Sequence, residues 1–276
     1  MSENPIELRS ADGAMASVHL HGGHVLSWTP AGERDSRLYL SPISKAAPGV
    51  AIRGGVPVIF PQFASEGPLP RHGFVRTARW SLLHQEQDGG QATAVLRLGS
   101  SAETLAIWPQ PFELRLRVTV GGDRLSLELA VGNTGREAMR FNAALHTYLQ
   151  VGEIGAAVLS GLQGLRYRDS AAGGVMRDEQ DEAVRIAGEV DRIYFEAPSA
   201  LALSDGQSHL RIEQTGFADT VVWNPGPTKA AALADLEQPD GYRHMLCVEA
   251  AVIGRPVGLA SGEHWTGSQT LVARSG

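Results

Sequence analysis

The sequence F-E-L-R-L-R-V-T-V at residues 112–120, followed by L-S-L-E-L-A-V at 125–131, contains the clearest pattern in the chain. In both runs large apolar residues alternate with polar or small ones, the period of two expected for strands with one buried face. Gly-Gly-Asp at 121–123 favours a turn between them. We therefore predict an antiparallel hairpin, and the same period continues over 139–143.

Shorter β-like runs are found at residues 16–20, 25–28, 200–203, 209–212 and 220–223, and the apolar run 58–60 between two prolines is too short to be a helix. Helical signals are few: capping-box spacing at Ser100 and Glu103, and an alanine-rich helix from Thr228 to Leu236 with Thr228 as N-cap. The polar stretch 170–189 has no clear period. Many short strands with few helices and no linker predict an all-β, mainly antiparallel sandwich, with residues 1–276 as a single domain.

Composition limits the partners of this chain of 276 residues. Its net charge of −6 argues against a nucleic-acid partner, because binding to a phosphate backbone needs a basic surface. Cys247 is the only cysteine, so an intrachain disulfide is impossible. No run is long and apolar enough for a signal peptide or a membrane span. We expect a cytoplasmic monomer that binds a small molecule and neither nucleic acid nor membrane.

The stretch from Arg53 to Arg76 combines glycines, prolines, a histidine and three arginines. Two glycines follow Arg53, so the backbone there can turn tightly or approach a ligand. Guanidinium groups bind carboxylate and phosphate bidentately, so Arg53, Arg71 and Arg76 together with His72 suggest a recess for an anionic ligand. The alternative is a surface turn with scattered arginines.

Glu249 is unusual because it lies in M-L-C-V-E-A-A-V-I, residues 245–253, the most apolar stretch of the chain. A buried carboxylate without a partner is costly, so such a residue is either partnered or used in chemistry. Burial would also raise its pKa towards a range useful for proton transfer. The alternative is a glutamate at a strand end that points to solvent.

His146 and Asp191 are two further candidates. His146 lies in the apolar run F-N-A-A-L-H-T-Y-L and is either a satisfied core residue or, with a desolvated glutamate, a general acid. Asp191 stands beside a β-like run and either binds a sugar hydroxyl or forms a salt bridge with an arginine such as Arg192.

Other chemistries have little support in the sequence. His19, His21 and His24 are close together but lack a nearby carboxylate, so we expect a polar strand edge rather than a metal site. The motifs G-x-x-x-x-G-K-[ST], G-x-G-x-x-G after a strand, G-x-S-x-G and H-E-x-x-H are absent. Nucleotide hydrolysis, dinucleotide chemistry and zinc proteolysis therefore lose their usual support.

Several motifs together resemble the aldose 1-epimerase (galactose mutarotase-like) superfamily, and within it the glucose-6-phosphate 1-epimerase, or hexose-6-phosphate mutarotase, branch. They are R-G-G-V-P-V-I-F-P-Q-F (53–63), L-P-R-H-G-F-V-R (69–76), W-P-x-P-F (108–112), A-L-H-T-Y-L (144–149), V-D-R-I-Y (190–194), V-V-W-N-P (221–225) and M-L-C-V-E-A (245–250). The resemblance implies a β-supersandwich with an open cleft and a reaction without metal or cofactor.

By this resemblance His146 matches the general acid and Glu249 the general base. Glu249 would take the proton of the C1 hydroxyl while His146 protonates the ring oxygen, and closure of the opened ring gives the other anomer. The implied substrate is a hexose 6-phosphate. The alternatives are epimerisation of unphosphorylated aldoses, or a sugar-phosphate-binding regulatory protein without turnover.

The resemblance also implies which residues bind the substrate. Arg53 and Arg76 match sugar-phosphate contacts, His72 matches a cleft histidine, and Asp191 matches an acid that binds a hydroxyl. Arg71 departs from the family pattern, so it either adds a phosphate contact or faces solvent.

Overall fold

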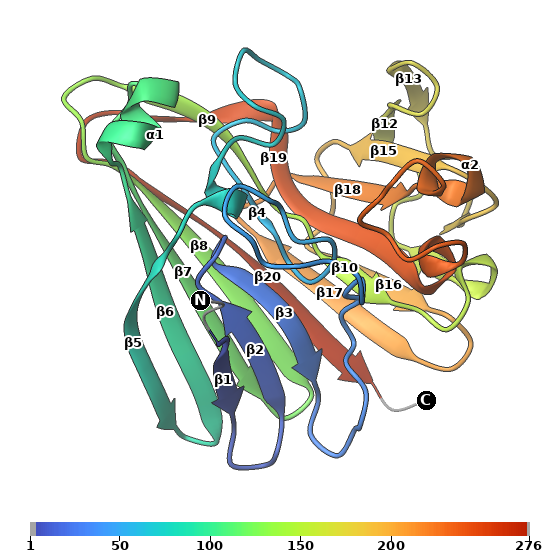
Figure 1. Ribbon diagram of the computed structural model, residues 1–276. Coiled ribbons are helices and arrows are strands. Elements are labelled where there is room, and N and C mark those ends of the chain that lie inside the picture. Colours follow the sequence, from blue (N-terminus) through green and yellow to red (C-terminus); the bar gives the residue numbers. More distant parts are fainter. Residues whose placement is uncertain (1–3, 275–276) are drawn as a thin grey trace.

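The two alternating runs form the predicted hairpin in the computed structural model, which describes residues 4–274 (Figure 1). β7 (Phe112–Gly121) pairs antiparallel with β8 (Arg124–Asn133), and Leu116 lies opposite Leu129. Both leucines are fully buried, so the apolar face of the hairpin points into the core as the period of two predicts.

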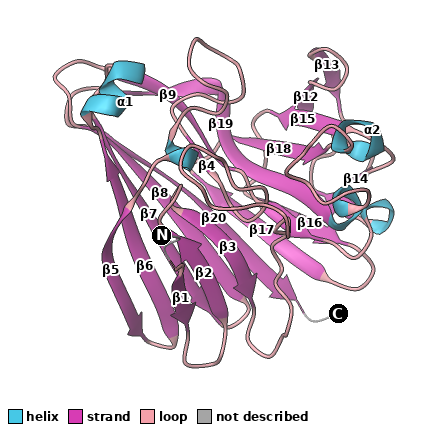
Figure 2. Cartoon of the chain, in the orientation of Figure 1, coloured by secondary structure: helices cyan, strands magenta, loops and turns pink. Residues whose placement is uncertain are grey.

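The strands within residues 4–274 form three sheets (Figures 1 and 2). The smallest contains β1 (Ile6–Arg9), β2 (Met15–His19) and β3 (His24–Thr29). The nine-stranded sheet has the order β14 (Ala183–Arg185), β11 (Val158–Ser160), β16 (Ala200–Ser204), β17 (His209–Thr215), β20 (His264–Arg274), β8, β7, β6 (Gln91–Gly99) and β5 (Ser81–Asp88). The eight-stranded sheet has the order β13 (Val175–Asp178), β12 (Arg166–Asp169), β15 (Val190–Tyr194), β18 (Asp219–Asn224), β19 (Met245–Leu259), β9 (Met139–Leu145) and β4 (Val58–Ile59), with β10 (Tyr148–Gln150) paired to β19.

The main hydrophobic core receives side chains from all three sheets. Trp28 of β3, Leu116 of β7, Phe141 of β9 and Val248 of β19 all belong to it and are buried. Their burial, at about 1.5–3 kcal/mol for each large side chain, supplies much of the free energy that holds the layers together. The predicted all-β, mainly antiparallel sandwich is confirmed.

β19 explains the most apolar stretch of the sequence, because it is buried on both faces. Leu246 and Val248 point into the main core, whereas Cys247 belongs to a separate cluster on the other face. Side chains two residues apart share a face of a strand, so Glu249 lies on the same face as Cys247. That face forms the floor of the cleft described below, and the solvent-facing strand end considered for Glu249 is wrong.

The helices are fewer and shorter than the strands, as expected, but their bounds differ from prediction. α1 (Ala102–Ile107) is capped by Ser101, whose hydroxyl pairs with Thr104 in a capping box, so the cap lies one residue after the predicted Ser100. α2 covers only Gly226–Ala230, and Thr228 lies inside it rather than at its N-cap.

The chain after α2 continues in turns with hydrogen bonds from residue i to i−3, which close a tighter ring than an α-helix allows. The remaining helical turns are the short 3₁₀ segments η1 (Val75–Thr77), η2 (Ile154–Ala156) and η3 (Gly241–His244).

The polar segment 170–189, for which no period was visible, contains the short strands β13 and β14. They are three or four residues long and lie at sheet edges, so too few buried positions exist to produce a readable alternation. Among residues 4–274 no helix is both long and apolar enough to cross a lipid bilayer.

Candidate active site

A cleft of about 600 Å³ lies on the face of the eight-stranded sheet that carries Glu249. All seven residues singled out in the sequence line it: Arg53, Arg71, His72, Arg76, His146, Asp191 and Glu249. Two of them lie on β15 and β19, His146 directly follows β9, Arg76 lies in η1, and the others lie in the loops around β4. Residues up to 196 positions apart are therefore gathered into one recess, which the sequence could not demonstrate.

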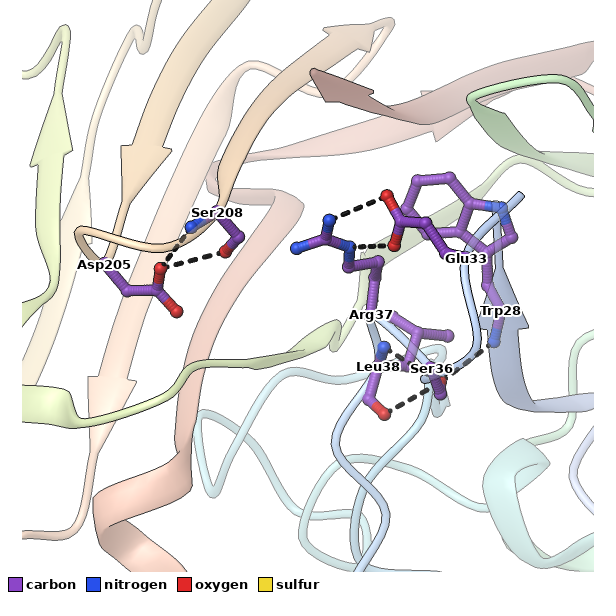
Figure 3. A network of polar contacts seen from close by, with 7 residues as sticks. All are labelled: Trp28, Glu33, Ser36, Arg37, Leu38, Asp205 and Ser208. Atoms are coloured by element: carbon purple, nitrogen blue, oxygen red, sulfur yellow. Dashed lines mark hydrogen bonds and ion pairs between the residues drawn. The ribbon is translucent and has the colours of Figure 1, made fainter. Parts of the chain in front are cut away.

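A larger recess of about 1060 Å³ lies near the loop 32–38 and the turn 205–208, where Glu33, Arg37 and Asp205 already have partners (Figure 3). Arg37 donates to both carboxylate oxygens of Glu33, at 2.5 and 2.7 Å. Asp205 accepts hydrogen bonds from the backbone and hydroxyl of Ser208, at 2.7 and 3.0 Å. This recess has no converging acid and base, so the smaller cleft is the candidate site.

Two glycines hold the loops that border the cleft. Gly55 has a φ of 59°, and a Cβ there would lie 2.1 Å from the carbonyl oxygen of Val25. Gly73 has a φ of 70°, and its Cβ would lie 1.9 Å from the carbonyl oxygen of Phe60. Only glycine fits at such contacts, and Gly73 thereby fixes the neighbouring His72 against the end of β4.

His146 and Glu249 form the centre of the cleft floor. The Nδ1 atom of His146 is 3.3 Å from Oε1 of Glu249, and the two side chains are 10% and 1% exposed. The angles do not make this contact a hydrogen bond, and Oε2 of Glu249 has no hydrogen-bond partner within residues 4–274. Buried polar groups are ordinarily hydrogen-bonded, so the missing hydrogen bonds of this pair are unusual. They indicate that the two side chains are kept for a ligand.

Burial shifts the pKa values of the pair in opposite directions. Removal from water raises the pKa of Glu249 well above its usual value and lowers that of His146 well below it. The charges of Arg71 and Arg76 oppose the rise of the Glu249 pKa, while Arg53 and Arg76 lower the His146 pKa further. Over the pH range between the two pKa values the pair carries one proton, and the directions of the shifts place this proton on Glu249.

Aromatic rings hold His146 in place. The ring of Tyr148 stacks on it at 4.8 Å and 8°, and the ring of His72 meets it at 5.6 Å. His72 accepts a hydrogen bond at Nδ1 from the backbone of Ala64, at 3.3 Å. Burial and three nearby arginines lower the pKa of His72 to about 3, so it is neutral and offers its other ring nitrogen to the cleft.

The three arginines differ in how they are held. Arg53 donates to the hydroxyl of Tyr148 at 2.9 Å and to Asp235 at 3.0 Å. Arg76 donates to the carbonyl oxygen of Arg71 at 3.1 Å. Within residues 4–274 neither Arg71 nor Arg76 has an ion-pair partner, so their positive charge faces the cleft uncompensated.

Asp191 lies in the cleft on β15 rather than in a salt bridge with Arg192, which pairs with Glu179 at 2.9 Å instead. The nearest cation to Asp191 is Lys229 of α2, at 3.8 Å. Burial raises the pKa of Asp191, so the carboxylate is partly desolvated and suited to accept hydrogen bonds from hydroxyl groups.

Tyr148, Trp223, Lys229 and Asp235 border or support the site but were not singled out in the sequence. Tyr148 and Trp223 lie in motifs quoted above, so the motifs carried a signal for them. Asp235 lies in a segment predicted as helix, where it had no distinguishing feature. Its contact with Arg53 spans 182 residues and depends on the tertiary structure.

One group among the described residues could offer three metal ligands: His146, Cys247 and Glu249, whose ligand atoms lie within 4.8 Å of one another. Burial raises the pKa of the Cys247 thiol well above its usual value. Metals bind the thiolate rather than the thiol, so this group suits a metal poorly.

The histidines near the N-terminus are used locally. His24 is fully buried, its Nε2 lies 2.7 Å from the carbonyl oxygen of Gly54, and burial lowers its pKa to about 3. His21 contacts the carbonyl oxygen of Val50 at 2.7 Å. His24 is thus a core residue, and the expected polar strand edge is wrong for it.

Comparison with known proteins gives matches over nearly the whole chain. A family model described as aldose 1-epimerase matches residues 5–272. Two curated relatives carry the name "Putative glucose-6-phosphate 1-epimerase": one from Cenchrus ciliaris is 37% identical over 97% of this chain and 84% of its own, and one from Escherichia coli is 35% identical over 86% and 79%.

Solved structures show the same fold. A structure from Salmonella typhimurium described as a "putative mutarotase" has a TM-score of 0.88 and 30% identity, covering 95% of this chain and 88% of that one. A galactose mutarotase related enzyme from Lactobacillus acidophilus has a TM-score of 0.76 at 14% identity, covering 98% of both chains, which shows the galactose mutarotase-like fold.

Proposed function

Because the chain belongs to the aldose 1-epimerase family, we propose that it interconverts the α and β anomers of hexose 6-phosphates such as glucose 6-phosphate. The observation that carries this proposal is the coexistence, in one cleft, of an acid–base pair with two arginines that lack an ion-pair partner within the described chain. The names of the curated relatives support the choice of substrate class.

The proposed chemistry uses Glu249 and His146 on the two oxygens attached to C1. The reaction starts from the state of the pair in which the proton has moved from Glu249 to His146. Glu249 then accepts the proton of the C1 hydroxyl, His146 donates its proton to the ring oxygen, and the bond between C1 and the ring oxygen breaks to give the aldehyde. After rotation about the bond between C1 and C2, the protons return and the ring closes as the other anomer. Each proton-transfer group contributes about 10²–10⁴-fold.

The remaining cleft residues bind the substrate in this proposal. Arg71 and Arg76 receive the phosphate, whose charge of nearly −2 at neutral pH matches two guanidinium groups. Arg53 lies beside Arg76 in the same cleft and provides a third guanidinium group for this phosphate. Asp191 accepts hydrogen bonds from sugar hydroxyls, and neutral His72 donates one from its free ring nitrogen.

The test is magnetisation-transfer NMR of anomer exchange in glucose 6-phosphate and in glucose, with wild type and Glu249→Gln. We expect fast exchange for the phosphate and a loss of about 10²–10⁴-fold in the variant. The variant should fold, because an uncharged amide replaces a buried carboxyl of similar shape. Circular dichroism checks that it does.

Each outcome of the exchange experiment leads to a different conclusion. Exchange of glucose alone would assign the protein to unphosphorylated aldoses. Wild-type protein that binds glucose 6-phosphate without accelerating exchange would make it a regulatory binding protein. A fully active Glu249→Gln variant would exclude Glu249 as the base.

A further inference from the structure

Arg53 is the one cleft arginine whose charge is compensated by a carboxylate of the described chain. Its Nη2 lies 3.0 Å from each carboxylate oxygen of Asp235, and its Nη1 donates to the hydroxyl of Tyr148 at 2.9 Å. The guanidinium also lies over the ring of Trp223, 5.8 Å from its centroid. The carboxylate of Asp235 therefore occupies the position at Arg53 where an anionic group of the substrate would bind.

The contact between Asp235 and Arg53 uses only part of the guanidinium. Both carboxylate oxygens face one nitrogen, and the Nε of Arg53 is buried without a hydrogen-bond partner in the described chain. A phosphate group can accept two parallel hydrogen bonds from Nε and Nη2 of an arginine. Arg53 thus has a stronger mode of anion binding than the one that Asp235 provides.

Asp235 is positioned so that its carboxylate can move away from Arg53. It lies in the turns between α2 and η3 rather than in a strand, and its side chain is 40% exposed against 20% for Arg53. Water can therefore solvate the carboxylate at little cost, since partly exposed ion pairs contribute little to stability. The guanidinium of Arg53 is more buried than this carboxylate, so its charge still requires an anionic partner when Asp235 moves away.

We propose that Asp235 is a specificity-determining residue: it holds the anion position at Arg53 in the free protein, and the phosphate of the substrate displaces it. This inference rests on the proposed function. A neutral sugar leaves the pair of Asp235 and Arg53 intact, whereas a phosphate group gains Arg53 only by competing with the carboxylate. A ligand therefore binds Arg53 only if its anionic group interacts with the guanidinium more favourably than the carboxylate of Asp235 does.

The variant Asp235→Asn tests the competition, because asparagine keeps the shape and can still accept from Arg53 but lacks the charge. We expect the KM for glucose 6-phosphate and the Kd for inorganic phosphate to fall about two- to fivefold, the range of a partly exposed ion pair. Inhibition by glucose, which has no phosphate, should stay the same. NMR exchange gives KM, and calorimetry gives Kd.

Asp240→Asn is the matched control. Asp240 lies on the same loop, contacts Arg243 at 3.5 Å and is not part of the cleft, so the same charge change there should leave both constants unchanged. A rise of KM and Kd in Asp235→Asn would show that Asp235 instead positions Arg53 for binding. Unchanged constants would show that phosphate does not use Arg53. Either result overturns the inference.

Failure of the proposed function gives a different pattern. If wild type does not exchange glucose 6-phosphate, the function fails, but calorimetry with inorganic phosphate still compares the two proteins. Tighter phosphate binding by Asp235→Asn would then support the competition without the enzyme activity. Unfolded variants are recognised by circular dichroism before either measurement.

Discussion

At the scale of single residues, the cleft places two ionisable groups where burial disfavours the charged form of each. Glu249 is held by β19 and His146 by the end of β9, with 3.3 Å between Nδ1 and Oε1. Arg76 adds a positive charge that lowers both pKa values. The pair must therefore be treated as one titrating unit with two apparent pKa values.

The pH dependence of activity should reveal this coupling. The active state carries one proton on the pair, so kcat/KM should fall on both sides of a bell-shaped profile. In Arg76→Gln a positive charge that disfavours protonation is lost, so both apparent pKa values rise. Both limbs of the profile should then move to higher pH. The profile of anomer exchange against pH measures the shift.

Arg34→Gln is the control, because Arg34 lines the other recess and should not move either limb. The ionisation of the substrate phosphate is common to all three proteins and cancels in the comparison. If neither limb of the pH profile shifts in Arg76→Gln, the profile does not report the titration of His146 and Glu249.

At the scale of elements, the loop 61–72 is closed onto the end of β4 by backbone contacts. Gly73 forms a bridge with Phe60, and the amide of Phe74 donates to the carbonyl oxygen of Phe60 at 3.3 Å. This closure brings His72 to the rim of the floor formed by β9 and β19. The close approach at Gly73 is therefore part of the site as well as of the fold.

Gly73→Ala should disturb both stability and activity. The new Cβ would meet the carbonyl oxygen of Phe60 at 1.9 Å, so the loop must move and take His72 with it. Gly89→Ala is the control, since Gly89 also has a positive φ, 57°, but nothing lies within 4 Å of its Cβ. Gly73→Ala should lose about 1–3 kcal/mol more than Gly89→Ala in urea unfolding.

Exchange activity should fall in Gly73→Ala and stay near the wild-type value in Gly89→Ala. Equal losses of stability in the two variants would mean that backbone strain alone, and not the contact with Phe60, explains the glycine.

At the scale of the whole molecule, a net charge of −6 surrounds a cleft with uncompensated arginines. The overall charge repels an anionic substrate at long range, while Arg71 and Arg76 attract it at short range. Salt screens charges over about 10 Å at 0.1 M, so it weakens the attraction of the partly exposed arginines.

The KM for glucose 6-phosphate should therefore rise with sodium chloride concentration. Arg71→Gln removes one of the two cleft charges without an ion-pair partner in the described chain, so its KM should be higher at low salt and rise less steeply. Arg34→Gln removes a positive charge outside the cleft and should keep the wild-type slope. Equal slopes in all three proteins would exclude Arg71 as a phosphate contact.

The sequence by itself determined the local structure of the strands. The period of two at 112–131 predicted a hairpin and its buried face, because alternation is a property of neighbouring residues. The continuous apolar run around Glu249 marked that carboxylate as unusual. Helix ends and the short edge strands in 170–189 were less readable, since few buried positions constrain them.

Only the tertiary structure decided what these elements build together. Strand period does not say which strand pairs with which, so the sequence did not reveal that β8 and β9, consecutive in the chain, lie in different sheets. The cleft joins Arg53, Asp191 and Glu249 through such long-range pairing, and the contact of Asp235 with Arg53 arises the same way. Contacts between distant residues depend on the packing of the whole chain, and local patterns carry no record of them.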